Sequence, residues 1–181
     1  MNFIELKLKG VFLLEAEVFE DKRGKFWRSF CQKEFEKVGL NPNVSQGNIS
    51  INPILGTLRG FHYQSEPCKE AKTISCLNGE IYDVIIDLRK SSPTYLDHCS
   101  VKISSNNKKS IHIPYGCANA WITTMSNTII HYYMSDPYSP NYGQGIRYND
   151  PFFKISWPME PNLISEKDLN YTDFDKNKHI N

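Results

Sequence analysis

The chain has 181 residues and carries 21 Lys and Arg side chains against 20 Asp and Glu side chains, so its formal net charge is +1. This balance gives no sign of a nucleic-acid-binding surface or of a basic membrane-binding patch. With 10 Tyr and 10 Phe the chain is too aromatic for a disordered protein, and its length suits one domain spanning residues 1–181.

The cysteines and the N-terminus indicate the compartment. Five cysteines, an odd number with no CxxC pair, argue against a disulfide framework and against a zinc site. Residues 1–10 alternate between apolar and polar, which predicts a strand and not a signal peptide, and no apolar run approaches the ~18 residues of a membrane span. We therefore expect a cytoplasmic protein with no bound metal.

Short strands separated by turns follow one another along the chain. The runs with strand character are 10–21, 56–64, 72–77, 80–88, 98–104, 110–114, 119–125 and 128–136. Turn-forming segments lie between them, at 21–25, 41–48, 77–80, 89–95, 104–110, 114–117 and 125–127. This spacing predicts an all-β sandwich or barrel.

Helical signals are few. Residues 29–39 predict a helix with Ser29 as its N-cap and Gly39 at its end. A second, short helix is predicted within "LISEKDLN" (163–170), and the polar ending 173–181 is expected to fray.

Among the five histidines, His62 has the surroundings of a base. It lies in "GTLRGFHYQ" (56–64), close to Arg59, whereas His112 and His131 alternate with apolar neighbours and His179 lies in the tail. No second histidine or carboxylate stands at metal-ligand spacing, and the ordinary pKa of histidine, ~6.5, suits proton transfer near neutrality. A structural histidine inside a β-barrel is the competing interpretation.

Three further side chains have both a functional and an ordinary interpretation. Lys72 opens a strand and would be either solvated or part of a site. Asp83 alternates with apolar residues of its strand, so it should point inward and need a donor, because an unpartnered buried carboxylate is costly. Tyr132 and Tyr133 point to opposite faces, so at most one of them faces a given cavity, either as a packed phenol or as a proton donor.

The motifs, taken together and in order, resemble a known family. "FEDKRGKF", "GTLRGFHYQ", "EAKTISCLNGEIYDVIIDLRKSSPTY", "IPYGCANAW", "YYMSDPYSP", "GIRYNDP", "ISWP" and "LISEKD" are similar to the dTDP-4-dehydrorhamnose 3,5-epimerase family over nearly the whole chain. The resemblance implies a cupin-type double-stranded β-helix (jelly roll) with short flanking helices, a homodimer, and no cofactor. It also implies a nucleoside-diphosphate 4-keto sugar as substrate, inverted at C3 and C5 beside the ketone.

The resemblance also assigns roles to residues. His62 matches the base, Asp168 its dyad partner and Lys72 the cation facing the enolate, while Tyr132 matches the acid on the opposite face. Phe26 stands where the family packs the nucleotide base, and Arg59 matches a diphosphate contact. The full set of candidate substrate-binding residues is Arg23, Phe26, Arg28, Gln46, Asn48, Arg59, Asp83, Asn119, Tyr138 and Lys167.

Several positions depart from the family pattern. Asn119 replaces a histidine near the keto oxygen, which predicts unequal steps, fast at C3 and slow at C5, shading into a C3-only enzyme. Arg28 replaces a nucleotide-contacting glutamate, Gly143 replaces another glutamate, and Gly47 interrupts a "QDN" element. These changes predict a nucleotide other than thymidine diphosphate, with guanosine diphosphate the leading candidate.

Two alternatives stay open, a 3,4-ketoisomerase of the related cupin families and a catalytically inactive nucleotide-sugar-binding cupin. A 4-keto-6-deoxyhexose and a 4-keto-heptose both fit as the sugar, and the expected role is the biosynthesis of a surface-polysaccharide sugar.

Overall fold

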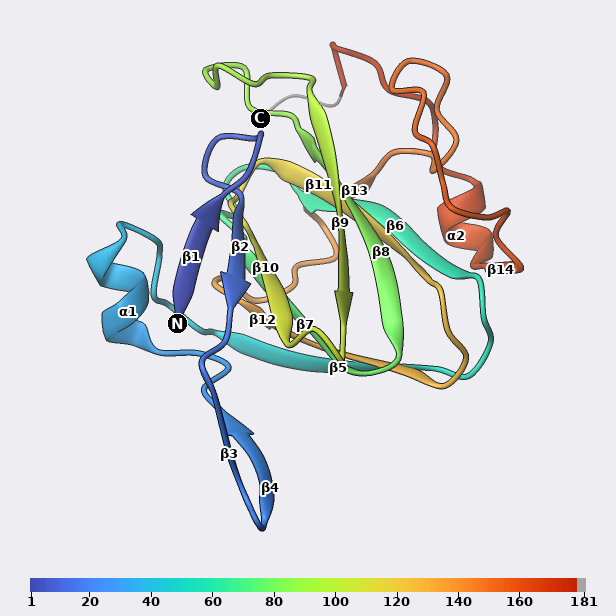
Figure 1. The fold of residues 1–181 in the computed structure, drawn as a ribbon. Helices are drawn as coiled ribbons and strands as arrows, with labels where there is room; N and C mark the ends of the chain where they lie inside the picture. The colour runs from blue at the N-terminus through green and yellow to red at the C-terminus, as the bar shows by residue number, and fades with distance from the viewer. Residues whose placement is uncertain (179–181) are drawn as a thin grey trace.

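The structure, a computed structural model, describes residues 1–178 and consists mainly of β-strands (Figure 1). The strands are β1 (Asn2–Glu5), β2 (Phe12–Glu15), β3 (Val18–Asp21), β4 (Gly24–Trp27), β5 (Gln46–Asn52), β6 (Thr57–Gln64), β7 (Lys72–Asn78), β8 (Glu80–Asp87), β9 (His98–Ser104), β10 (Lys109–Ile113), β11 (Cys117–Thr123), β12 (Thr128–Met134), β13 (Gly143–Gly145) and β14 (Leu163–Ile164). The helices are α1 (Gln32–Lys37) and α2 (Glu166–Leu169). Within residues 1–178, no helix is both long and apolar enough to cross a membrane.

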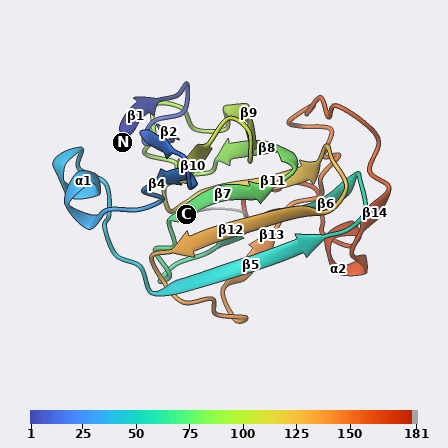
Figure 2. The same cartoon turned by 60° about the horizontal axis from the view of Figure 1, so that its bottom comes forward.

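Two sheets form the body of the molecule. One has the strand order β1-β2-β10-β7-β12-β5, and the other has the order β13-β6-β11-β8-β9 with β14 added in parallel to β6. Figures 1 and 2 show the sheets facing each other, with β5 at an open edge. The prediction of an all-β jelly roll with short flanking helices is confirmed.

The central strands of the second sheet, β6, β11 and β8, are largely buried on both faces. The inner face of this sheet packs against the first sheet through one apolar cluster, which includes Ile74, Ile85 and Trp121. Its outer face carries a second cluster, in which Phe61 packs with Phe153 of the C-terminal part of the chain. Every residue of β11 is therefore buried, which is why this strand has apolar side chains on both faces.

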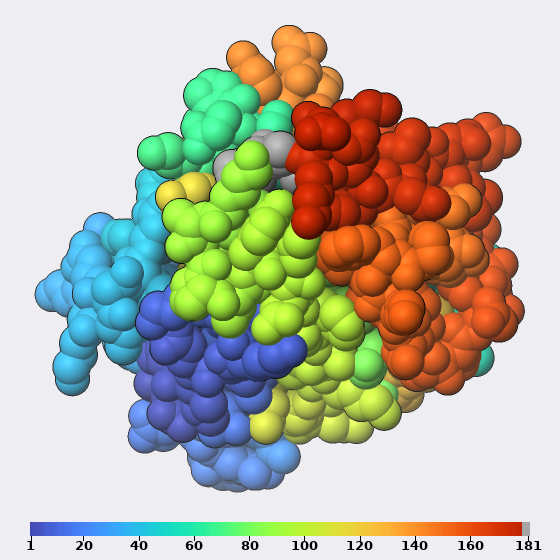
Figure 3. All heavy atoms as spheres, turned by 90° about the horizontal axis from the view of Figure 1, so that it is seen from above, coloured from blue at the N-terminus to red at the C-terminus, as the bar shows by residue number. Residues whose placement is uncertain are grey.

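The C-terminal segment is attached to the body of the molecule at Asp173 and Phe174. Figure 3 shows it in red, packed against the orange part of the chain. Asp173 forms an ion pair with Arg147 at 2.7 Å, and the backbone N–H of Phe174 donates to the Asp150 carboxylate. The fraying expected from residue 173 is therefore wrong at Asp173 and Phe174. Residues 175–178 form a turn in which the Lys178 N–H donates to the Asp175 carbonyl at 3.0 Å. The last part of that expectation, at 179–181 with His179, lies outside the described residues.

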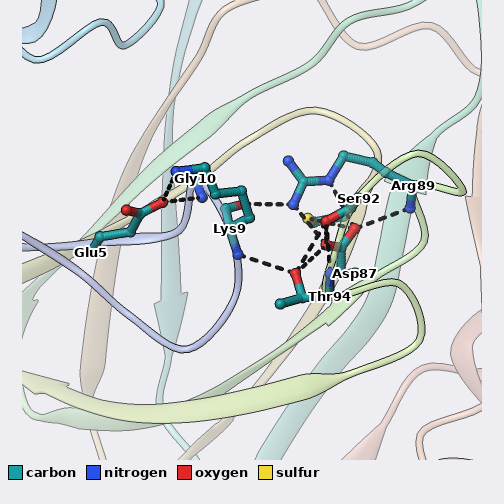
Figure 4. A network of polar contacts seen from close by, with 8 residues as sticks. Glu5, Lys9, Gly10, Asp87, Arg89, Ser92 and Thr94 are labelled. Carbon is teal, nitrogen blue, oxygen red and sulfur yellow. Dashed lines mark hydrogen bonds and ion pairs between the residues drawn. The ribbon is translucent and has the colours of Figure 1, made fainter.

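A buried aspartate ties the first loop of the chain to the turn between β8 and β9 (Figure 4). Asp87 accepts hydrogen bonds from Arg89 at 2.8 Å and from Thr94 at 2.7 Å, and Arg89 also donates to the Lys9 carbonyl at 2.6 Å. Burial alone would raise the pKa of Asp87, but these donors bring it below its ordinary value.

Two local predictions were wrong. The 41–48 segment was predicted as a turn, but β5 begins at Gln46 and points polar side chains inward and Ile49 outward, which inverts the usual pattern of a strand. Helix α1 is shorter than predicted and has Cys31 at its N-cap with no side-chain cap. The Ser29 hydroxyl lies 3.3 Å from the Tyr133 hydroxyl instead.

Candidate active site

A cavity of about 550 Å³ lies between the two sheets. Its walls come from β5, β7 and β12 of the first sheet and from β6, β11 and β13 of the second, with Lys167 added from α2. The predicted site residues that line it are Gln46, Asn48, Arg59, His62, Lys72, Asn119, Tyr132, Tyr138 and Lys167. Its volume is within the range of small-ligand sites.

An extra residue in β6 brings Arg59 and His62 into the same cavity. Residues three apart on a regular strand point to opposite faces. Here Asn119 of β11 pairs with His62 and Trp121 pairs with Arg59, so three steps along β6 match two along β11. This β-bulge returns both side chains to the cavity. Gly60 forms it with φ +122°, at a place where a Cβ would lie 2.5 Å from the Ala120 Cβ.

Asp168 holds both the bulge and the imidazole. Its Oδ1 lies 2.7 Å from Nε2 of His62, and its Oδ2 accepts the backbone N–H of Gly60 at 3.2 Å. Ser165 caps α2 by accepting the N–H of Asp168, which fixes the position of this residue. Burial would raise the pKa of Asp168, but the hydrogen bonds and the charge of His62 hold it below its ordinary value.

This pair is suited to proton abstraction. The Asp168 side chain is only 5% exposed, whereas the His62 side chain is 41% exposed toward the cavity. Because Nε2 faces the carboxylate, Nδ1 remains to take a proton, and no hydrogen bond within residues 1–178 engages that atom. A carboxylate in this place stabilises the imidazolium that forms.

A second chain of polar contacts runs from Glu70, Lys72 and Asn119 in the cavity wall to the buried Asp83. Lys72 forms an ion pair with Glu70 at 2.7 Å and donates to Oδ1 of Asn119 at 3.4 Å. The Asn119 amide donates in turn to Oδ1 of Asp83 at 3.4 Å. Lys72 is therefore a fixed cation, but part of its charge is already balanced by Glu70.

Asp83 lies behind the cavity and not in its lining. It is fully buried, as its strand pattern predicted, and burial raises its pKa to about 8 against the opposing effects of Asn119 and Lys72. Its Oδ2 has no hydrogen-bond partner among residues 1–178. The raised pKa favours the protonated form of this carboxyl, whose Oδ1 accepts from Asn119. The direct substrate contact predicted for Asp83 stays a prediction, and its side chain does not line the cavity.

The tyrosines follow the predicted alternation. Tyr132 of β12 lines the cavity, whereas Tyr133 faces away and packs on Phe30 with ring centroids 5.5 Å apart. Tyr138 also lines the cavity, and Lys167 interacts with its hydroxyl. Since Tyr132 and His62 come from opposite sheets, a phenol and an imidazole face the same space from two sides.

Polar side chains line other parts of the cavity walls and are held by hydrogen bonds. Arg59 donates to Asn52 at 3.1 Å and lies over the Trp121 ring, 5.8 Å from its centroid. Gln46 donates to Asn48 at 3.0 Å and accepts the backbone N–H of Tyr138 at 2.9 Å. These residues present one guanidinium and several amides to a polar ligand.

Three predicted residues lie on or next to the β3–β4 hairpin, away from this cavity. Arg23 and Phe26 lie on the β3–β4 hairpin, which projects from the body in Figure 1, and Phe26 is 71% exposed. Arg23 pairs with Asp21, and Arg28 pairs with Glu34 at 2.7 Å. A contact of these residues with a ligand in the cavity of their own chain is therefore not supported by the fold.

Other lining residues were missed in the sequence. They are Tyr63, Gln64, Glu70, Trp121, Met134, Gln144 and Tyr171, among others. Glu70 had a signal, since it lies two residues before Lys72 and so on the same side of the chain. The only signal for Tyr171 in the sequence was its position shortly after Asp168. Within residues 1–178, no three His, Cys, Asp or Glu side chains cluster as metal ligands would.

Known proteins match this chain along nearly its whole length. The family model described as dTDP-4-dehydrorhamnose 3,5-epimerase matches residues 5–176. A dTDP-4-dehydrorhamnose 3,5-epimerase from Shigella flexneri is 39% identical over 171 residues, covering 94% of each chain.

Solved structures show the same fold. The dTDP-4-dehydrorhamnose 3,5-epimerase of Bacillus anthracis, with TDP and PPi bound, superposes with a TM-score of 0.92 at 34% identity, covering 96% of this chain and 99% of that one. The dTDP-6-deoxy-D-glucose-3,5-epimerase of Legionella pneumophila, in complex with dTDP-4-keto-L-rhamnose, superposes with a TM-score of 0.88 at 34% identity, covering 95% and 92%.

Proposed function

This chain belongs to the dTDP-4-dehydrorhamnose 3,5-epimerase family, and we propose that its cavity inverts the stereocentres beside the ketone of a nucleoside-diphosphate 4-keto sugar. It is an isomerase, a sugar epimerase. The observation that carries the proposal is that His62 of one sheet, paired with Asp168 of α2, lies opposite Tyr132 of the other sheet. Base and acid on opposite sides of one carbon are what inversion requires.

The proton steps follow from these positions. Nδ1 of His62 takes the proton from the carbon beside the ketone, and the electron pair of that C–H bond moves into an enolate. Lys72 faces the developing oxygen charge, and Asp168 stabilises the imidazolium. Tyr132 then gives its phenolic proton to the opposite face of the carbon, and both side chains exchange protons with water before the next step.

Asn119 bears on which carbon reacts faster. Its amide oxygen accepts from Lys72 and its amide nitrogen donates to Asp83. Because an amide is neutral, Asn119 brings no charge to the enolate oxygen. Stabilisation of the oxygen then depends on Lys72, part of whose charge is balanced by Glu70. We keep the expectation of fast reaction at C3 and slow reaction at C5.

Two nucleotides are candidates. Thymidine diphosphate comes first, since the relatives described above carry it in their names or in their complexes. Guanosine diphosphate, predicted from Arg28, Gly143 and Gly47, is the second candidate, and the pairing of Arg28 with Glu34 reduces its support. Arg59 and Lys167 are the cations that we assign to the diphosphate or the nucleotide. The sugar, a 4-keto-6-deoxyhexose or a 4-keto-heptose, would enter the biosynthesis of a surface polysaccharide.

We propose a homodimer in which a second copy supplies the three residues that lie away from the cavity. Support comes from exposed apolar side chains on the hairpin and on the edge strand β5, since Phe26, Ile49 and Ile51 are 71%, 66% and 65% exposed. Light scattering should give twice the mass of 20.9 kDa. Mixing inactive His62→Asn and Arg23→Ala proteins should restore part of the activity if Arg23 acts across the interface, and no recovery would assign it to its own chain.

Proton NMR in deuterium oxide tests the function. With a dTDP-linked 4-keto-6-deoxyhexose, the C3 signal should disappear first and the C5 signal more slowly, with epimerised product appearing. A product whose ketone has moved to C3 would support the ketoisomerase alternative. Nucleotide binding without any exchange, for the thymidine and the guanosine forms alike, would support the inactive binding protein.

A further inference from the structure

Two glycines on β13 allow two tyrosine rings to pack closely against this strand beside the cavity. Gly145 pairs with His62 and Gly143 pairs with Gln64 across the β13–β6 ladder. A Cβ on Gly145 would lie 2.2 Å from the ring of Tyr171, and one on Gly143 would lie 3.2 Å from the ring of Tyr138. The Tyr171 ring therefore occupies the space of the side chain that Gly145 lacks, directly beside His62.

Tyr171 makes an aromatic contact with His62. The ring centroids are 6.0 Å apart and the planes meet at 71°, an edge-to-face arrangement. Asp168 restrains the imidazole only at Nε2. One hydrogen bond leaves the ring free to swing about that contact, so a second neighbour is needed to fix its plane and the direction of Nδ1.

The chain around Tyr171 is itself restrained. Lys167, one helical turn earlier, interacts with the Tyr171 hydroxyl and also with that of Tyr138. On the other side, the Thr172 carbonyl accepts the backbone N–H of Arg147 at 3.2 Å, next to the ion pair of Asp173 with Arg147. Tyr171 is thus held between α2 and an attached C-terminal segment.

We propose that Tyr171 is a positioning residue whose ring, seated over Gly145, fixes the plane of the His62 imidazole for proton abstraction. The kinetic part of this inference rests on the function proposed above. The structural part does not, because the contact exists in the protein without substrate. The aromatic ring of Tyr171, and not its hydroxyl, makes the contact that fixes the imidazole.

Four variants test the proposal in the exchange assay: Tyr171→Ala, Tyr171→Phe, Gly145→Ala and the double variant Gly145→Ala/Tyr171→Ala. Removing the ring should lower the maximal exchange rate by at least ~10-fold with KM changed by less than ~2-fold, because a misplaced base slows chemistry without weakening binding. Tyr171→Phe keeps the ring and should stay within about threefold of the parent protein.

Gly145→Ala perturbs the same contact from the side of β13. Its new Cβ meets the tyrosine ring, so it should slow exchange in the parent protein but add no further loss when Tyr171 is already alanine. An unchanged maximal rate in Tyr171→Ala would overturn the proposal. Equal losses from Gly145→Ala in both backgrounds would overturn it as well.

An NMR measurement without substrate separates this proposal from the proposed function. The imidazole C–H signals of His62, assigned by their absence in His62→Asn, should carry a ring-current shift from Tyr171. The shift should persist in Tyr171→Phe, disappear in Tyr171→Ala and change in Gly145→Ala. If these shifts are found but no 4-keto sugar reacts, the positioning contact stands and the proposed function fails. Identical shifts in all variants would overturn the contact.

Discussion

Replacing Asp168 by asparagine removes the charge beside His62 while keeping the shape of the side chain. Oδ1 of the carboxylate lies 2.7 Å from Nε2. Placing the charge centres about 4 Å apart at an effective dielectric constant of ~20 gives an attraction of ~4 kcal/mol for the protonated imidazole. Because the His62 side chain is 41% exposed, screening by water reduces this, and we take about half, ~2 kcal/mol.

A loss of ~2 kcal/mol from the transition state corresponds to a rate decrease of about 30-fold. An asparagine that turns its amide N–H toward His62 also places the imidazole proton on Nδ1, where the base must be free, so the decrease should be at least this large. Deuterium incorporation at C3 measures it, with Glu166→Gln, an exposed carboxylate on the same helix, as the control. If Asp168→Asn and Glu166→Gln exchanged at the parent rate, the dyad would play no part in catalysis.

Three further predictions concern the acid, the bulge and the buried carboxyl. Tyr132→Phe should still exchange protons with solvent but form epimerised product at least ~10²-fold more slowly than the parent protein. The measurement is the ratio of deuterium incorporated to epimerised product, and an unchanged ratio would assign the acid role to another group. Gly60→Ala should lower the free energy of unfolding by ~2 kcal/mol more than Gly24→Ala; both glycines have φ near +120°, but a Cβ at Gly24 meets nothing within 4 Å, and equal losses would refute the packing argument. Burial raises the pKa of Asp83 to about 8, so the folded state keeps a proton that the unfolded chain releases near pH ~4, and stability should fall as the pH rises. Urea titrations should show that the free energy of unfolding decreases by up to ~1.4 kcal/mol between about pH 7 and pH 8, and Asp83→Asn should remove this decrease. If the free energy of unfolding depended on pH equally in the parent protein and in Asp83→Asn, the assignment would be refuted.

The sequence predicted the parts of the site that depend on alternation or on recognisable motifs. Tyr132 and Tyr133 had to face opposite sides of a strand, and Asp83 shared the inward side with apolar neighbours, as observed. The tripartite arrangement of His62, Asp168 and Lys72 came from the resemblance, since nothing in their spacing brings residues so far apart in the chain together.

Other features depended on tertiary structure. Regular alternation would separate Arg59 from His62, and only the extra residue at Gly60, opposite Ala120, reunites them. The start of strand β5, residues 46–48, was predicted as part of a turn because the inward side chains of this strand are polar and face a cavity instead of a core. The contact of Tyr171 with His62 depends on the path of the chain after α2, for which the sequence has no periodic signal.

The most direct test of the central claim compares the parent protein with His62→Asn in deuterium oxide, using a dTDP-linked 4-keto-6-deoxyhexose. The account predicts that the parent incorporates deuterium beside the ketone, whereas His62→Asn incorporates none at C3 or C5 and binds thymidine diphosphate with nearly the same affinity. Full incorporation by His62→Asn would contradict the account, because a group other than His62 would then be removing the proton.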